Sequence, residues 1–257
     1  MKTTRRMTAG AALALSLCLV LLGGCGGQKK DQRSESTEIR ALVDGVVTAY
    51  GGLEAMRRVE GYRSEGTLFA AQQGVNTRTR RWFKRPDCLL LELAYPGRPE
   101  WRLTRGTKGW TGAREGDWTP AAMPRIWPMR LQTVRFDLPL RLYEQEAALV
   151  MMLADEKGWP VLRLTIDEGL HMEYHVDPEA HLIRRVMMVM DGPPAMVFQA
   201  DYAEFRKVEG VLFPHHEETW ARGTMTSMIR IKTIEINPAD LDLKLAEPDQ
   251  RKTEGMI

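Results

Sequence analysis

The sequence predicts a mainly β protein, in which a curved antiparallel sheet of about 11–12 strands forms an incomplete barrel with helices across its opening. Three observations predict this fold class. Apolar residues recur at helical spacing in one segment near the start of the chain. Most of the remaining chain alternates with a period of two between turn residues, and one proline-rich segment in the middle follows neither pattern.

The helical segment covers residues 38–59. Its apolar residues, among them Ile39, Leu42 and Val46, are three or four positions apart, so they share one face of a helix. Gly51 and Gly52 interrupt the pattern. We expect one helix that is broken at this pair and packs on the sheet.

The alternating segments predict the strands. Short turns such as 85–87 connect several of them, which favours antiparallel pairing. Neighbouring strands twist by about 20–25°, so a sheet of this size curls around whatever covers its apolar face. The predicted strands are 63–71, 76–85, 88–95, 100–105, 109–114, 147–154, 160–167, 170–176, 182–190, 195–207, 211–222 and 224–236.

The exceptional segment is 120–145, which carries prolines at positions 120, 124, 128 and 139. It is rich in apolar residues but lacks sustained alternation. Because proline disrupts the interior of a helix, the segment predicts short helices broken by prolines and laid across the sheet.

The start of the chain has the features of an export signal. A basic beginning is followed by roughly 14 apolar residues, too few for a helix that spans a membrane. The signal ends in Leu22-Gly23-Gly24-Cys25, which is similar to the lipobox of bacterial lipoproteins. We therefore predict a signal peptide over 1–24, acylation of Cys25, a flexible polar tether over 25–37, a folded domain over 38–240 and a tail over 241–257.

Composition excludes one class of partner. The chain has 36 lysines and arginines against 34 aspartates and glutamates, and removing the three basic residues of the predicted signal leaves 33 against 34. Without a basic surplus, nucleic acid is a poor candidate partner. Cys18 lies in the predicted signal and Cys25 is the predicted acylation site, so Cys88 has no partner and is expected to be a small buried apolar residue.

Several short motifs then follow one another in a fixed order. They are 49–55 (AYGGLEA), 85–87 (RPD), 108–110 (KGW), 176–178 (VDP), and 201–202 (DY) leading to 208–215 (VEGVLFPH). Over residues 49–237 this order resembles the outer-membrane lipoprotein-sorting (LolA/LolB-like) superfamily. The resemblance implies a half-barrel whose helical lid covers a hydrophobic cavity, and some members bind the acyl chains of lipoproteins. The lipobox makes this chain more like the membrane-anchored acceptor than the soluble carrier.

The similarity to bacterial lipoproteins also implies a location, and the strand pattern indicates a set of lining residues. Gly26, and not Asp, follows Cys25, which favours the outer membrane, with the domain facing the periplasm. Alternation along the strands, or a place in the proline-rich segment, predicts which residues line the cavity. They are Trp101, Leu103, Trp127, Leu131, Met172, Tyr174, Met188, Met190, Met196 and Phe198.

Catalysis is not expected, and neither is a cofactor. His171 and His175 would suit a metal on a helix, but on a strand residues four apart are separated by roughly 13 Å. His215 shares a strand face with Glu217, and the pair would need further ligands from other strands to hold a metal.

Three functions remain open. The first is a lipid-anchored envelope lipoprotein that binds acyl chains, lipoproteins or another hydrophobic ligand in its cavity. The second is a non-catalytic envelope interaction or sensor module whose cavity is filled by its own side chains. The third is a metal-dependent hydrolase, which requires His215 or His216 to converge with two further ligands.

Overall fold

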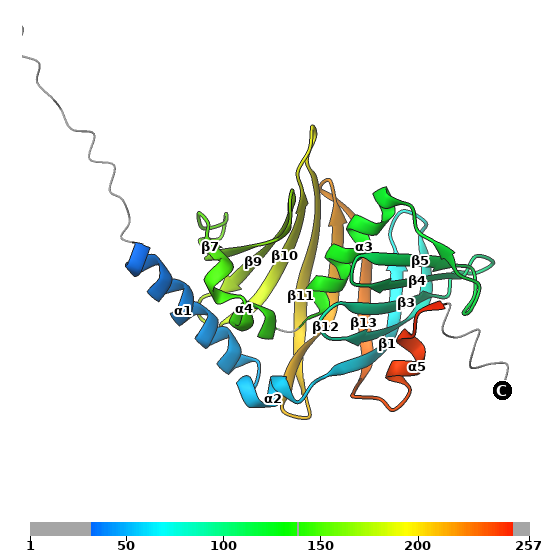
Figure 1. Ribbon diagram of the computed structural model, residues 1–257, viewed down its shortest axis with the longest axis horizontal. Helices are drawn as coiled ribbons and strands as arrows, with labels where there is room; N and C mark the ends of the chain where they lie inside the picture. The colour runs from blue at the N-terminus through cyan, green and yellow to red at the C-terminus, as the bar shows by residue number, and fades with distance from the viewer. Residues whose placement is uncertain (1–31, 138, 249–257) are drawn as a thin grey trace, which may run out of the picture.

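A single antiparallel sheet dominates the structure, a computed structural model that describes residues 32–137 and 139–248. Within these residues the sheet has 13 strands and is accompanied by five α-helices (Figure 1). The sheet is not closed, since β6 and β7 lie at its two ends. The prediction of a mainly β half-barrel with an N-terminal helix and a helical insertion is confirmed. The predicted signal peptide and Cys25 lie outside the described residues.

The strands follow the order β6-β5-β4-β3-β2-β1-β13-β12-β11-β10-β9-β8-β7. Two meanders are thus joined where β13 pairs antiparallel with β1. All twelve predicted strands are present, and β6 is an additional short one. The bounds are β1 Gly61–Ala70, β2 Val75–Lys84, β3 Cys88–Leu93, β4 Glu100–Arg105, β5 Lys108–Gly112, β6 Thr119–Pro120, β7 Leu149–Met151, β8 Val161–Asp167, β9 Leu170–Asp177, β10 Leu182–Met190, β11 Met196–Val208, β12 Val211–Ala221 and β13 Thr224–Ile236.

The N-terminal helix begins earlier than the sequence predicts. Helix α1 covers Gln32–Ala49, so its first residues belong to the segment predicted as tether. Ile39, Val43 and Val46 are buried and fix the helix against the core. Once a helix is anchored in this way, each added residue contributes a further hydrogen bond at little cost, which explains the extension into polar sequence. Among the described residues, no helix is both long and apolar enough to cross a membrane.

The predicted helix break is confirmed, and it joins two of the motifs noted in the sequence. After α1 the chain turns through Gly51, at φ +117°, and α2 follows at Leu53–Arg57. A Cβ atom on Gly51 would lie 2.2 Å from the carbonyl oxygen of Gly210, in the turn between β11 and β12. The amide of Leu212 donates a hydrogen bond to the carbonyl of Tyr50. The glycine is therefore needed for close approach of two backbones.

The proline-rich insertion forms a longer helix than expected. Helix α3 covers Met123–Phe136 and runs through Pro128, and it is followed by α4 (Leu140–Glu144) and a 3₁₀ turn, η1 (Glu146–Ala148). An interior proline loses one backbone hydrogen bond and costs about 3 kcal/mol. Burial of side chains such as Leu131 offsets that cost.

Helix α3 crosses the concave face of the sheet (Figure 1). It contacts β4 and β5 on one side and β9 and β10 on the other. The helix therefore bridges the two halves of the open barrel.

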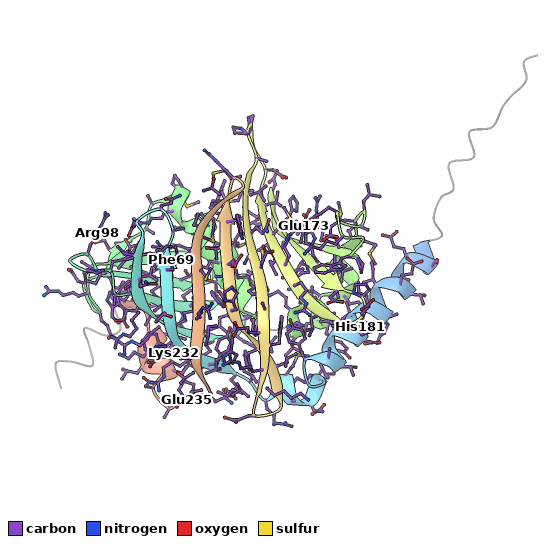
Figure 2. The ribbon with its side chains drawn as sticks, turned by 180° about the vertical axis from the view of Figure 1, so that it is seen from behind. Phe69, Arg98, Glu173, His181, Lys232 and Glu235 are labelled. Atoms are coloured by element: carbon purple, nitrogen blue, oxygen red, sulfur yellow. The ribbon has the colours of Figure 1, made fainter. Side chains whose placement is uncertain are left out.

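Apolar side chains are buried on both faces of the sheet. The largest cluster lies between α1, α3, α4 and the β8–β12 half, and contains Val43, Leu131 and Met172. On the outer face, α5 (Leu241–Leu245) packs Leu241 and Leu245 against the opposite half of the sheet. These residues fall in the segment predicted as a tail. Elsewhere the outer face carries exposed polar side chains, such as those of Lys232 and Glu235 on β13 (Figure 2).

Candidate ligand-binding cavity

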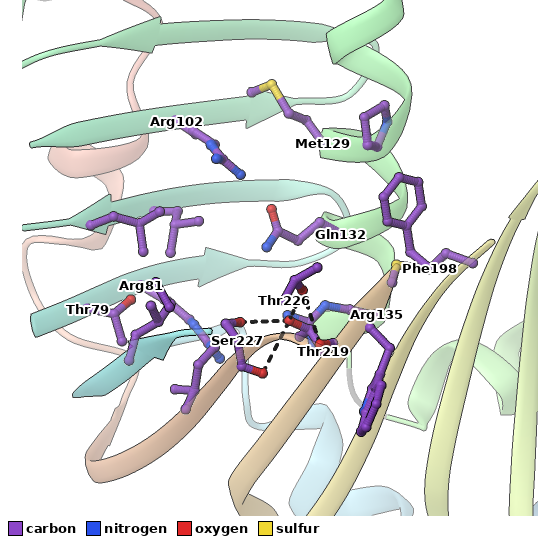
Figure 3. Close-up of a pocket in the computed structure, with 18 of the residues that line it drawn as sticks. Thr79, Arg81, Arg102, Met129, Gln132, Arg135, Phe198, Thr219, Thr226 and Ser227 are labelled. Carbon is purple, nitrogen blue, oxygen red and sulfur yellow. Dashed lines mark hydrogen bonds between the residues drawn. The ribbon is translucent and has the colours of Figure 1, made fainter. Parts of the chain in front are cut away.

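A cavity of about 470 Å³ lies between α3 and the concave face of the sheet (Figure 3). Its volume is within the range of about 300–1,000 Å³ that is usual for small-molecule sites. Strands β1–β4 form one wall, β10–β13 the other, and α3 the cover. The lining residues are Leu68, Ala70, Gln72, Gln73, Thr79, Arg81, Leu91, Leu93, Tyr95, Arg102, Arg125, Pro128, Met129, Gln132, Arg135, Met188, Phe198, Gln199, Thr219, Trp220, Thr226, Ser227 and Ile229.

One part of this lining is apolar. Leu68, Leu91, Leu93 and Ile229 are buried and belong to one cluster that spans β1, β3 and β13. Leu91 and Leu93 lie two apart on β3, as alternation requires for side chains on one face of a sheet, and Leu68 pairs with Ile229 across β1 and β13. They give the cavity a wall on which a hydrocarbon chain can lie.

The other part of the lining is polar and contains a buried ion triad. Arg81 on β2 donates to Glu217 on β12 at 2.7 Å (Nη1 to Oε1) and 3.0 Å (Nη2 to Oε2). Arg135 on α3 donates to the same carboxylate at 3.2 Å, and to the hydroxyl of Tyr202 at 3.1 Å. The three charged side chains are at most 3% exposed. The triad therefore attaches the covering helix to both halves of the sheet.

The triad also separates two cavities. Arg81 and Arg135 line the large cavity on one side and a second one of about 60 Å³ on the other. Burial opposes ionisation of Glu217, but the two guanidinium groups outweigh it and hold the pKa of this carboxyl below its ordinary value of 4.5. The pKa of Tyr202 is raised by burial, so its hydroxyl stays protonated and accepts from Arg135.

A second ion cluster holds the other end of the insertion. Asp137 follows α3 directly, and its carboxylate accepts from Arg85 at 2.7 Å and from Arg141 at 3.0 Å. Arg85 also pairs with Glu144 on α4 at 2.7 Å. Arg85 belongs to the predicted turn after β2, so this motif attaches the turn between β2 and β3 to the covering helices.

The predicted lining residues divide into five groups, of which four lie on the concave side of the sheet or on α3. Met188 and Phe198 line the cavity, and Tyr174 lines the small second one. Trp127 lies on α3 and is 40% exposed. Leu131, Met172, Met190 and Met196 belong to the main core or pack against it.

Trp101 and Leu103 lie on the opposite face from the predicted one. They pack in the outer cluster with Trp82, under α5. On β4 it is Arg102, between them in sequence, that faces the cavity. Alternation separates the two faces of a strand but does not say which face is concave, and here α5 provides an apolar cover for the outer one.

Sequence reasoning missed the polar residues of the cavity. Thr77, Thr79 and Arg81 alternate along β2 with outward residues, ahead of the inward Phe83. In the sequence, the available signal was an arginine at a position that alternation places on the same face as the apolar Phe83. Its partner Glu217 is 136 residues away, so the pairing itself required the fold.

His171, His175 and His215 each contact a different partner. His171 Nε2 lies 3.0 Å from Asp191, and His175 Nδ1 lies 2.9 Å from Asp155. His215 contacts the carbonyl of Ile231. Across the described part of the chain, no group of three or more His, Cys, Asp and Glu residues is placed to hold a metal ion.

The fold and the cavity together define a class, that of open antiparallel half-barrels with a helix-covered cavity. By sequence, no family model and no curated protein matches the chain. By structure, it resembles a DUF1329 family protein from Desulfovibrio piger (TM-score 0.55, 11% identity, covering 82% of this chain and 98% of that one). It also resembles a LolA superfamily protein from Nitrosomonas europaea (TM-score 0.53, 10% identity, covering 78% and 94%). The chain therefore has a LolA-like fold, as the motifs predict.

Proposed function

We propose that this protein is an envelope lipoprotein that binds acyl chains, or another hydrophobic ligand, in the cavity beneath α3. Cys25 would carry its lipid anchor, and the outer membrane, facing the periplasm, is its proposed location. The proposed partners are the membrane, to which the N-terminal acyl chains attach the protein, and a lipid or lipoprotein ligand. The proposed role is binding and not catalysis.

The observation that carries the proposal is the cavity itself. It has room for a ligand of about 470 Å³, and one wall is formed by Leu68, Leu91, Leu93 and Ile229. The LolA-like fold supports the proposal because the cavity lies under a helical cover. Burying a hydrocarbon chain against such a wall contributes about 0.8 kcal/mol per methylene group.

Native mass spectrometry combined with lipid extraction tests the proposal on protein purified from a bacterial envelope. We expect co-purified acyl species at a ratio approaching one per chain. Thr79→Phe should displace them, because the Thr79 side chain lines the cavity and is 2% exposed. Thr67→Phe is the matched control, since Thr67 lies next to Leu68 on β1 and points to the outer face. Equal lipid content in both folded variants would contradict the proposal.

The anchor needs its own test. Cys25→Ser should move the protein from the membrane fraction to the soluble fraction of the cell. Retention in the membrane fraction, with the rest of the chain unchanged, would refute the acylation of Cys25.

One observation favours the alternative, an interaction module. Met123 and Trp127, one helical turn apart on α3, are 62% and 40% exposed. Arg125 and Arg130 lie on the same helix. An envelope protein could dock on this apolar pair, and crosslinking from position 127 in whole cells would detect such a partner. A crosslink that persists in Thr79→Phe would favour docking over ligand transfer.

A further inference from the structure

The cavity wall carries more positive than negative charge. Four arginines line it, namely Arg81, Arg102, Arg125 and Arg135, and no aspartate or glutamate is among the lining residues that the structure describes. Two carboxylates behind the wall serve these four guanidinium groups. Arg81 and Arg135 share Glu217, while Arg102 and Arg125 share Glu100.

Each pair therefore leaves one positive charge that its carboxylate does not balance. The Glu217 cluster is almost fully buried, at 2–3% exposure, so water screens its excess charge poorly. At the Glu100 cluster, Arg102 uses its Nε to donate to Glu100 at 2.9 Å. Within residues 32–137 and 139–248 the two Nη groups of Arg102 have no hydrogen-bond partner and can bind a ligand, and Figure 3 shows this guanidinium pointing into the cavity.

Two further polar groups in the cavity wall can donate a hydrogen bond to a ligand. The hydroxyl of Thr79, on a residue 2% exposed, has no hydrogen-bond partner among the described residues. The indole Nε1 of Trp220, which can only donate, also lacks one there. Both residues line the cavity. A buried polar group without a partner costs about 1–3 kcal/mol, so a ligand that supplies acceptor oxygens relieves this cost.

The apolar and basic features occur in the same cavity. Leu91 and Leu93 on β3 adjoin Arg102 on β4, because Leu91 pairs with Arg102 in the sheet register. A ligand that satisfies both features needs a hydrocarbon chain and an anionic end group. A neutral hydrocarbon leaves the donors unpaired, and a cationic amphiphile is repelled by the four arginines.

We infer that the cavity binds an amphiphile with an anionic head group, a carboxylate or a phosphate monoester, which Arg102 holds while the chain lies on the leucine wall. This inference rests on the proposed function and specifies its ligand. Guanidinium groups recognise such head groups through paired, charge-assisted hydrogen bonds.

Calorimetric titration of the delipidated full chain tests the inference with three matched probes below their micelle concentrations. These are dodecyl phosphate, dodecanol and dodecyltrimethylammonium, and inorganic phosphate is the probe without a chain. We expect dodecyl phosphate to bind about tenfold or more tightly than dodecanol, since one charge-assisted hydrogen bond supplies that factor. Dodecyltrimethylammonium should bind more weakly than both.

Arg102→Met removes the guanidinium but leaves the Arg81–Glu217–Arg135 triad intact. The preference for dodecyl phosphate over dodecanol should fall to within about threefold in this variant. Arg230→Met is the matched control, because Arg230 is exposed and alternates with the inward Ile229 and Ile231 on β13. Its preference should equal that of the unmodified protein. Thermal melting of both variants checks that they are folded.

The outcomes separate the two proposals. Equal affinity for all three amphiphiles would refute the anionic head-group site but would still support the proposal that the cavity binds hydrophobic ligands. Binding of none of them would overturn both. Inorganic phosphate that binds as tightly as dodecyl phosphate would show a simple anion site and overturn the amphiphile. A preference that Arg102→Met does not change would refute the role of Arg102.

Discussion

The buried triad gives the sharpest test of how α3 is held on the sheet. In Glu217→Gln the side chain keeps its shape but loses its charge, which leaves Arg81 and Arg135 as two unbalanced guanidinium groups. All three side chains are at most 3% exposed, so water cannot replace the lost carboxylate. Removing one partner of a buried ion cluster costs about 3–5 kcal/mol.

For a domain of this size, 1 kcal/mol shifts the melting temperature by about 2–4 °C, so the expected loss is about 6–20 °C. Urea unfolding at neutral pH, followed by circular dichroism, measures the free energy directly. Glu218→Gln is the control, because Glu218 is the next residue on β12 and pairs at 3.3 Å with the partly buried His216. Its expected effect is within about 0.5 kcal/mol.

A double-mutant cycle with Arg135→Met completes the test. If Glu217 acts through the two arginines, removing Arg135 as well should recover part of the loss, so the two effects are not additive. The reasoning is refuted if Glu217→Gln costs under about 1 kcal/mol, or no more than Glu218→Gln.

Three other predictions concern stability. Because the pKa of Glu217 is lowered in the folded protein, the ionised carboxylate stabilises the fold fully above pH 4.5, and this stabilisation is lost as the pH falls below that value. The free energies of unfolding measured in urea at pH 7 and pH 3 should therefore differ less in Glu217→Gln than in the unmodified protein. Gly51→Ala should lower the free energy of unfolding by about 2 kcal/mol or more, because its Cβ would lie 2.2 Å from a carbonyl oxygen. Gly52→Ala, also at positive φ but with nothing within 4 Å, should lower it by about 1 kcal/mol. Equal losses in urea unfolding would contradict the contact at Gly51. Leu131→Ala should cost about 2–5 kcal/mol because Leu131 is fully buried under α3, and Leu153→Ala, at a residue 91% exposed, should cost almost nothing by the same measurement.

The strands and the first helix could be predicted because their signals are local. Period-two alternation bounded by turn residues located every predicted strand, and the spacing of residues such as Ile39 and Val46 located α1. The start of α1 at Gln32 and the run of α3 through Pro128 could not be predicted in this way. In both cases burial elsewhere in the helix outweighs the local preference of the residues concerned.

The cavity required the tertiary structure. Met188 and Phe198 were accessible from the sequence, because apolar residues on an alternating strand are natural candidates for an inner wall. Trp101 and Leu103 had the same signal, yet they lie on the outer face under α5. A period of two distinguishes two faces, but which face is concave depends on the helices that cover each one.

The sequence by itself determined an antiparallel sheet, a broken N-terminal helix and an irregular helical insertion, because each depends on the pattern of residues close together in the chain. Only the tertiary structure decided that Arg81, Arg135 and Glu217, on two distant strands and one helix, share a buried site. These three charged side chains can be buried only as a cluster, because the desolvation free energy of each charge is too large without an oppositely charged partner. The physical reason is the curvature of the open sheet, which brings β2 and β12 together beneath α3.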